Sequence, residues 1–325
     1  MYNKVIILFY VIILLYLLAT KFIGFNLISN STIISIFKIN GNYKKDQLIN
    51  TLNSFDVFNY QLYNNFLVKT KNKSYQIIHN DDNINNDSIL IIYVYEFTDY
   101  HEFKVVATHK LFDMQLLLNI INDYINNNTN NKEMCIYRNF LPLISLIPST
   151  ICIVNLLKSN TNSCTNISFD KYYIEQIKNN SMNGSYLSDI DIVISLLTKN
   201  YMDHRNRSSC NISISKSIRN KQNKYKIGNI IMPNSVHIKN NNIENIAKTI
   251  RNSYTQKNIF IKECNIYITS WVPNKEISQN LTSVVPMSWY NNNSTNYNWG
   301  YKYNFIVLFF DRLTNKYNCY IENKS

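Results

Sequence analysis

Glycine and proline are scarce in this sequence, with only five of each among 325 residues. Asparagine, isoleucine, lysine and tyrosine are abundant instead, a bias that is typical of A/T-rich coding sequences. Composition is therefore a weaker guide to function than usual. Hydrophobic residues still make up 46% of the chain, which excludes wholesale disorder and allows either one large domain or two small ones.

Metal-binding signatures are also missing. The cysteines form no C-x-x-C pair and show no spacing with histidine that is typical of a metal site. We therefore predict no metal, and no permanently bound cofactor. An even number of cysteines permits disulfides in a translocated chain but does not require them. The six cysteines are Cys135, Cys152, Cys164, Cys210, Cys264 and Cys319.

Nucleic-acid signatures are absent as well. The formal net charge is +12, but no arginine-rich arm accompanies it, and abundant lysine accounts for the excess. We predict no nucleic-acid partner. N-x-[ST] sequons occur, for example at Asn166, Asn211 and Asn280, but chance supplies most of them in a chain so rich in asparagine.

A long apolar run occurs once, near the N-terminus. Residues 5–19 read VIILFYVIILLYLLA, and apolar character resumes at 22–25 after Lys21. No small-x-small cleavage site follows the run, so an uncleaved signal-anchor is favoured over a cleaved signal peptide. Residues 1–25 are thus predicted to form a single transmembrane segment that places the protein at a membrane.

Hydrophobic periodicity predicts a mixed α/β (α+β) fold downstream of this segment. No repeat period is present, and the elements fall into two subdomains, residues 30–130 and 166–325, joined by a crossover at 131–165. Strands are expected at 33–41, 65–70, 74–79, 88–97, 104–109, 210–218, 227–232, 266–271 and 304–310. Helices are expected at 44–55, 114–125, 187–202 and 242–256, with a strand followed by a helix at 168–180. Ser188 is the expected N-cap of its helix, with Asp191 in the first turn.

His109 and Asp113 form the most informative local pattern. His109 ends a strand, and Asp113 follows four residues later, immediately before a leucine-rich helix. A neutral imidazole is the best general base available at neutral pH. His-x-x-x-Asp alone also fits a partly buried histidine without catalytic function, so further motifs must decide.

Further motifs occur in order along the chain. The segment THKLFDM resembles the H-x-x-x-D-G motif of the CoA-dependent acyltransferase superfamily, which includes chloramphenicol acetyltransferase, condensation domains and the BAHD transferases. The order of the downstream motifs is most similar to that of the BAHD branch. These motifs are YRNFLP at 137–142, ISFDKYYIEQIKNN at 167–180, LSDIDIVISLLTK at 187–199, SIRNKQNKYKIGNIIMP at 217–233, IENIAKTIRNSY at 243–254, IYITSW at 266–271 and NYNWGYK at 296–302.

The resemblance implies two chloramphenicol-acetyltransferase-like subdomains with a solvent tunnel at their interface. His109 would be the general base that deprotonates an acceptor hydroxyl or amine, which then attacks the thioester of acyl-CoA. Asp113 would point away from the imidazole and pair with Arg219, fixing the loop that carries His109. Acyl-CoA is then a co-substrate, and the acceptor a small molecule or a lipid.

The resemblance also implies supporting residues. Thr269 and Ser270 are the candidate hydrogen-bond donors to the oxyanion of the tetrahedral intermediate. Structural support of the site would come from Gly228, Asn229, Trp299 and Gly300.

The sequence departs from the family pattern at several positions. Met114 stands where the motif has glycine, and Asn296 and Asn298 replace the Asp and the first Gly of D-F-G-W-G. The part before His109 is also short. Three hypotheses therefore remain: a membrane-anchored acyltransferase, a catalytically inactive relative with a structural or interaction role at a membrane, and an unrelated glycosylated surface-binding module.

Overall fold

The computed structural model describes residues 31–63, 66–79, 88–136, 163–180, 186–217, 219–220, 222–228, 231–239, 242–255, 265–274, 276–291 and 304–323. The expected anchor, most of the crossover, and the site residues Asn229, Trp299 and Gly300 lie outside these ranges. Within the described ranges, no helix is both long and apolar enough to cross a membrane. The anchor at residues 1–25 stays a prediction.

The chain divides into two compact units, each built from separate stretches of sequence. Unit 1 comprises Met1–Arg138, Arg219–Ile230 and Met287–Asn292, and unit 2 comprises Asn139–Ile218, Ile231–Pro286 and Asn293–Ser325. The division expected from sequence, at 30–130 and 166–325, assigned 219–230 and 287–292 to the second subdomain. Both segments belong to unit 1 instead, because they contact residues that are far away from them in the sequence.

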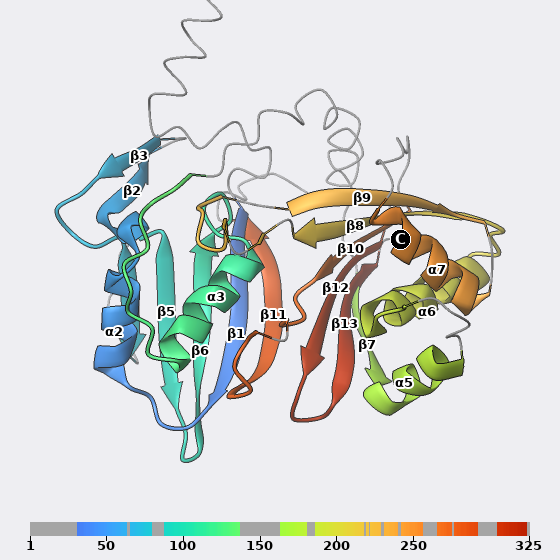
Figure 1. Ribbon diagram of the computed structural model, residues 1–325, viewed down its shortest axis with the longest axis horizontal. Coiled ribbons are helices and arrows are strands. Elements are labelled where there is room, and N and C mark those ends of the chain that lie inside the picture. The colour runs from blue at the N-terminus through green and yellow to red at the C-terminus, as the bar shows by residue number, and fades with distance from the viewer. Residues whose placement is uncertain are drawn as a thin grey trace, which may run out of the picture. The chain divides into compact units, whose positions relative to one another are not determined.

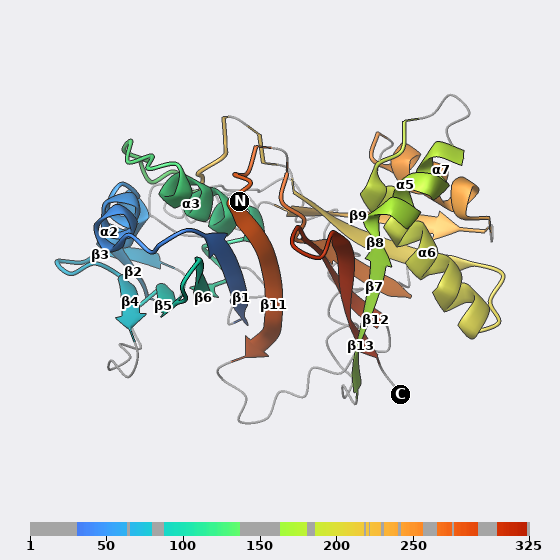
Figure 2. The ribbon, with the colours of Figure 1, turned by 90° about the horizontal axis from the view of Figure 1, so that it is seen from below.

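Unit 1 contains a five-stranded sheet with the order β11-β1-β6-β5-β4. Strand β6 pairs antiparallel with both β1 and β5, and β4 pairs parallel with β5. Helices α2 and α3 cover one face of this sheet (Figures 1 and 2). The elements are β1 (Ser31–Asn40), α2 (Lys45–Asn53), a 3-10 turn (Asp56–Asn59), the hairpin β2 (Tyr60–Tyr63) and β3 (Phe66–Lys69), β4 (Tyr75–His79), β5 (Leu90–Glu96), β6 (Tyr100–Thr108), α3 (Met114–Ile125) and β11 (Leu281–Asn291), of which only the part from Met287 onward belongs to unit 1.

Unit 2 contains a six-stranded mixed sheet with the order β7-β13-β12-β10-β8-β9. Its three central strands, β12, β10 and β8, run parallel, and the outer pairings are antiparallel. Helices α5, α6 and α7 lie on one face of the sheet (Figures 1 and 2). The elements are β7 (Ser163–Asp170), α5 (Lys171–Asn180), α6 (Asp189–His204), β8 (Cys210–Ser217), β9 (Ile231–Ile238), α7 (Ile243–Ser253), β10 (Ile266–Ser270), β12 (Asn304–Asp311) and β13 (Lys316–Asn323).

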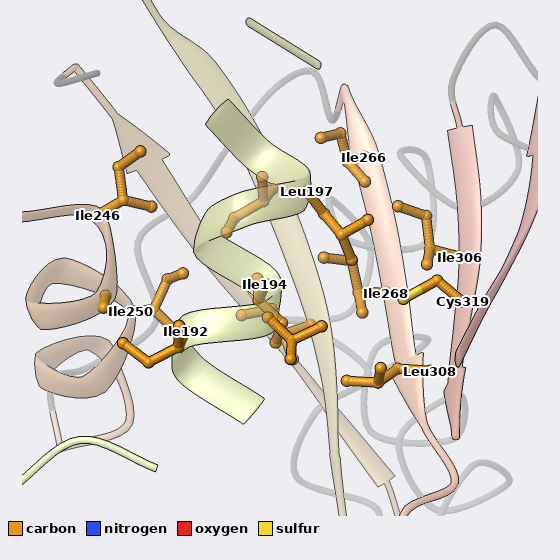
Figure 3. Packing of buried hydrophobic residues seen from close by; sticks show 14 of the residues in the cluster. Ile192, Ile194, Leu197, Ile246, Ile250, Ile266, Ile268, Ile306, Leu308 and Cys319 are labelled. Atoms are coloured by element: carbon orange, nitrogen blue, oxygen red, sulfur yellow. The ribbon is translucent and has the colours of Figure 1, made fainter. Parts of the chain in front are cut away.

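The core of unit 2 is aliphatic and rich in isoleucine. Side chains of α6 and α7 point toward those of β10, β12 and β13, as Figure 3 shows. Burying such side chains contributes roughly 1.5–3 kcal/mol each, so this layer supplies much of the stability of the unit. Ser188 caps α6 together with Asp191 in a reciprocal capping box, which confirms the expected start of this helix.

Most expected elements are present, and the exceptions have physical explanations. The helix expected at 114–125 has the same limits in the structure. The strand expected at 227–232 begins only at Ile231, because Gly228 adopts φ +119° and the chain bends there. Strands β2, β11 and β13 were not anticipated from the sequence. Pro286 interrupts the strand-like sequence pattern of β11. A proline is tolerated there because β11 is an edge strand.

Candidate functional site

His109 directly follows β6 and continues the inward-facing register of that strand. Residues 101, 103, 105 and 107 of β6 are buried, whereas the residues between them are partly exposed. His109 has the same parity and is only 3% exposed. Because successive side chains of a strand point to opposite faces, the alternation of β6 directs the imidazole away from solvent.

The hydrogen bond of the His109 ring defines its tautomer. Nδ1 lies 3.0 Å from the carbonyl oxygen of Phe112. A carbonyl oxygen can only accept, so the neutral ring carries its proton on Nδ1, and the lone pair is on Nε2. Burial lowers the pKa of His109, although the Phe112 carbonyl and the charge of Asp113 oppose this shift in part. The ring is therefore neutral at neutral pH, as a general base must be.

Asp113 holds the beginning of α3 and faces Arg219. It is the N-cap of α3, and its Oδ1 accepts from the backbone N–H of Leu116 at 2.8 Å. Both carboxylate oxygens also accept from Nε of Arg219 at 2.9 Å, and both side chains are nearly inaccessible to solvent. The contact between Asp113 and Arg219 that the resemblance implied is thus present.

Arg219 also organises the chain that follows it, residues 219–228, which we call the 219–228 segment. Its guanidinium donates to four backbone carbonyls of this segment, at 2.8 to 3.3 Å: those of Asn223, Lys224, Lys226 and Gly228. Gly228 in turn donates its N–H to the carbonyl of Leu111 at 2.9 Å. The loop between His109 and Asp113 is therefore held by one side chain and one backbone contact from the same segment.

The remaining site residues expected from sequence are not brought into this cluster by the described contacts. Thr269 and Ser270 end β10 in unit 2, where both are partly buried and pair with Val307 and Leu308 of β12. Their oxyanion role stays a prediction, as does the solvent tunnel. Asn229, Trp299 and Gly300 lie outside the described residues.

A second buried histidine, His101, lies on the same face of β6 and was not singled out from the sequence. Its Nδ1 lies 2.7 Å from the carbonyl of Gly41, and its Nε2 lies 3.1 Å from the hydroxyl of Tyr124. That hydroxyl also accepts from the backbone N–H of Lys44. The chain of hydrogen bonds ties the turn before α2 to β6 and α3. The sequence could have indicated this histidine, because residue 101 has the same position in the strand alternation as the buried residues 103, 105 and 107.

Burial of these two histidines predicts a stability that declines in mild acid. Burial lowers the pKa of His101, against opposing effects of the Gly41 carbonyl and Glu96, and it lowers the pKa of His109 as well. The unfolded state then binds protons more readily than the folded state. Stability is full above the unfolded pKa of about 6.5 and is lost as pH falls toward the folded values.

This expectation is checked by the melting temperature measured from about pH 7.5 to about pH 5.5. The melting temperature should fall with pH, and His101→Asn, which keeps a donor beside Gly41 but does not titrate, should flatten part of the slope. A wild-type melting temperature that stays level or rises over this range would contradict the expectation.

Comparison with known proteins identifies the fold. No family model matches the sequence, and no curated protein matches it. The structure is similar to the condensation domain from Monacolin K polyketide synthase MokA, with a TM-score of 0.59 and 11% identity over 92% of this chain and 87% of that chain. It is also similar to vinorine synthase, with a TM-score of 0.58 and 12% identity over 90% and 86%.

A third similar structure is polyketide synthase associated protein 5 from Mycobacterium tuberculosis, with a TM-score of 0.61 and 9% identity over 94% of each chain. Condensation domains and vinorine synthase share the chloramphenicol-acetyltransferase-like fold of the CoA-dependent acyltransferases. The mixed α/β class that hydrophobic periodicity predicted and the chloramphenicol-acetyltransferase-like fold that the motifs implied are therefore both confirmed. At identities this low, the similarity concerns the fold alone.

Proposed function

We propose that this protein is an acyl-CoA-dependent acyltransferase in which the neutral imidazole of His109 is the general base. The observation that carries the proposal is the hydrogen bond from Nδ1 to the Phe112 carbonyl, because it places the proton of the neutral ring on Nδ1 and the basic lone pair on Nε2. The buried pair of Asp113 and Arg219 supports it by restraining the loop on which His109 lies. The fold, shared with condensation domains and a synthase, supports the same class of reaction.

The reaction follows from these groups. Nε2 of His109 removes the proton of the acceptor O–H or N–H while the acceptor oxygen or nitrogen attacks the thioester carbonyl carbon. The carbonyl oxygen gains the negative charge of the tetrahedral intermediate, for which Thr269 and Ser270 are the proposed donors. Collapse breaks the carbon–sulfur bond, and the CoA thiolate takes the proton from the imidazolium. The Phe112 carbonyl stabilises the imidazolium by accepting from Nδ1–H.

The direct test measures free CoA released from short-chain acyl-CoA donors with a panel of alcohols and amines. We expect acceptor-dependent release by the purified full-length chain. Release that is independent of acceptor would indicate thioester hydrolysis rather than transfer. No release with any donor would refute the proposal, whether or not calorimetry shows binding of CoA.

We further propose that residues 1–25 anchor the enzyme in a membrane, on the basis of the apolar run at 5–19 and the absence of a cleavage site after it. The full chain should remain with membranes after washing at alkaline pH, should be released by detergent, and should retain its original N-terminus. A mature N-terminus located after residue 20 would instead show that the segment is a cleaved signal peptide.

One observation favours a second candidate, a catalytically inactive protein that keeps the fold for a structural or interaction role. Met114 occupies the glycine position of the motif, is buried, and is the first residue of α3. Its side chain adds volume immediately beside the His109 loop, where an acceptor would approach. This candidate predicts no turnover, either with binding of CoA or without it.

A further inference from the structure

Unit 1 contains a second buried ion pair, which the proposed reaction does not use. Asp123, in the last turn of α3, lies 3.2 Å from Nζ of Lys132, and both side chains are almost completely buried. Oδ1 of Asp123 also accepts from the hydroxyl of Tyr225 at 3.0 Å and from the side-chain amide of Asn128 at 3.0 Å. Burial and the charge of Asp123 raise the pKa of Tyr225, so its hydroxyl is protonated and donates.

Lys132 joins this pair to the turn that follows α2. Its ammonium donates to Oγ of Ser54, and it lies 5.0 Å from the ring centre of Phe55 and 5.5 Å from that of Tyr225. Its backbone N–H donates to Ser54, and its carbonyl accepts from Asp56. The ammonium also donates to the carbonyl of Asn128 at 3.0 Å, so it is enclosed by one carboxylate, one hydroxyl, one carbonyl and two aromatic rings.

Stability alone does not account for such a pair. Removing two charges from water costs about as much as their attraction returns, and apolar residues of similar volume often stabilise a fold equally well. A buried pair with directional partners instead favours one arrangement of the segments that it joins. Here those segments are the end of α3, the turn after α2 and the 219–228 segment, which supplies Tyr225.

The 219–228 segment connects this cluster to the loop between His109 and Asp113. Tyr225 is fixed to Asp123 at the end of α3, while the same segment contacts that loop through Arg219 and through the backbone of Gly228. The side chain of Asn119, in the middle of α3, donates to the carbonyl of Lys224 at 3.1 Å and adds another contact. The segment therefore lies along α3, attached near both ends of the helix.

We propose that Asp123, Lys132 and Tyr225 are positioning residues for His109, acting through the 219–228 segment. If Tyr225 is released, the carbonyls that hold the Arg219 guanidinium shift, because they belong to the same short segment. Nε of Arg219 is then no longer held against the Asp113 carboxylate, and the loop that carries His109 loses its restraint. The kinetic part of this inference rests on the proposed function, but the orientation of the His109 ring does not.

The test compares Tyr225→Phe with a matched control, Tyr317→Phe. Tyr317 donates to Asp189 at 2.8 Å, and Asp189 pairs with Lys178 at 2.8 Å, so unit 2 contains the same Tyr–Asp–Lys chemistry. Both variants lose one hydroxyl, and both should lower the melting temperature by a few degrees. The full-length chain is labelled with ¹⁵N-histidine, and the ring nitrogen shifts of its five histidines are recorded. The His109 signals are assigned with His109→Gln.

We expect the His109 ring shifts to change in Tyr225→Phe and to match wild type in Tyr317→Phe. In the CoA-release assay, Tyr225→Phe should lower kcat by about 10- to 100-fold with little change in the KM for the acyl donor, because misplacement of a base affects the transition state more than binding. Tyr317→Phe should keep wild-type kcat.

Unchanged His109 ring shifts in a folded Tyr225→Phe would overturn the positioning role. If Tyr225→Phe does not fold, Asn119→Ala is used instead, because it removes another contact of the 219–228 segment and leaves the ion pair intact. The His109 ring shifts of that variant then decide whether the segment positions His109. A wild type without turnover refutes the proposed function, and the ring shifts then decide the positioning role on their own.

Discussion

Replacing His109 by alanine is expected to lower acyl transfer by about 10²–10⁴-fold, the usual contribution of a general base. The hydrogen bond from Nδ1 to Phe112 places the lone pair of the neutral imidazole on Nε2, where a general base needs it. Without it, the acceptor must lose its proton to solvent while it attacks the thioester. Binding of CoA should persist, because the change removes no group that is assigned to donor binding. The measurement is the rate of CoA release at saturating donor and acceptor.

Two further variants make this result interpretable. His109→Gln keeps most of the buried side-chain volume, so it separates loss of the base from the cavity that alanine leaves. His204→Ala removes an exposed imidazole at the end of α6 and should retain wild-type turnover. Equal turnover by wild type and His109→Ala would remove His109 from the mechanism.

Replacing Asp113 by asparagine is expected to lower stability and rate together. Asparagine caps helices as well as aspartate does, so the hydrogen bond from Leu116 can be retained while the charge is lost. Arg219 then remains buried without its counter-charge, which costs roughly 3–5 kcal/mol for a fully buried pair. The free energy of unfolding from urea titration gives the first effect, and CoA release by the folded fraction gives the second.

Asp191→Asn provides the matched control. Asp191 also caps a helix and pairs with an arginine, Arg251, but that side chain is one-third exposed and water can partly replace the lost charge. This variant should cost less stability and leave the rate of the folded protein unchanged. A stability of Asp113→Asn equal to that of wild type would show that the Arg219 charge is compensated by other groups.

Local features were accessible from the sequence because they depend on neighbouring residues. The alternation of β6, the limits of α3 and the capping of α6 by Ser188 each follow from residues within a few positions of one another. The family resemblance added the pairing of Asp113 with Arg219, 106 residues away.

Other features were decided only by the tertiary structure. Strand β11 enters the sheet of unit 1 beside β1, although Pro286 obscures its strand pattern and roughly 240 residues separate the two strands. The Asp123–Lys132–Tyr225 cluster has no recognisable sequence spacing, since Asp123 and Tyr225 are 102 positions apart. Strand alternation and helix capping are set by backbone geometry over a few residues. Which strands pair and which buried charges meet depends instead on the burial of whole segments, and spacing along the chain does not encode that choice.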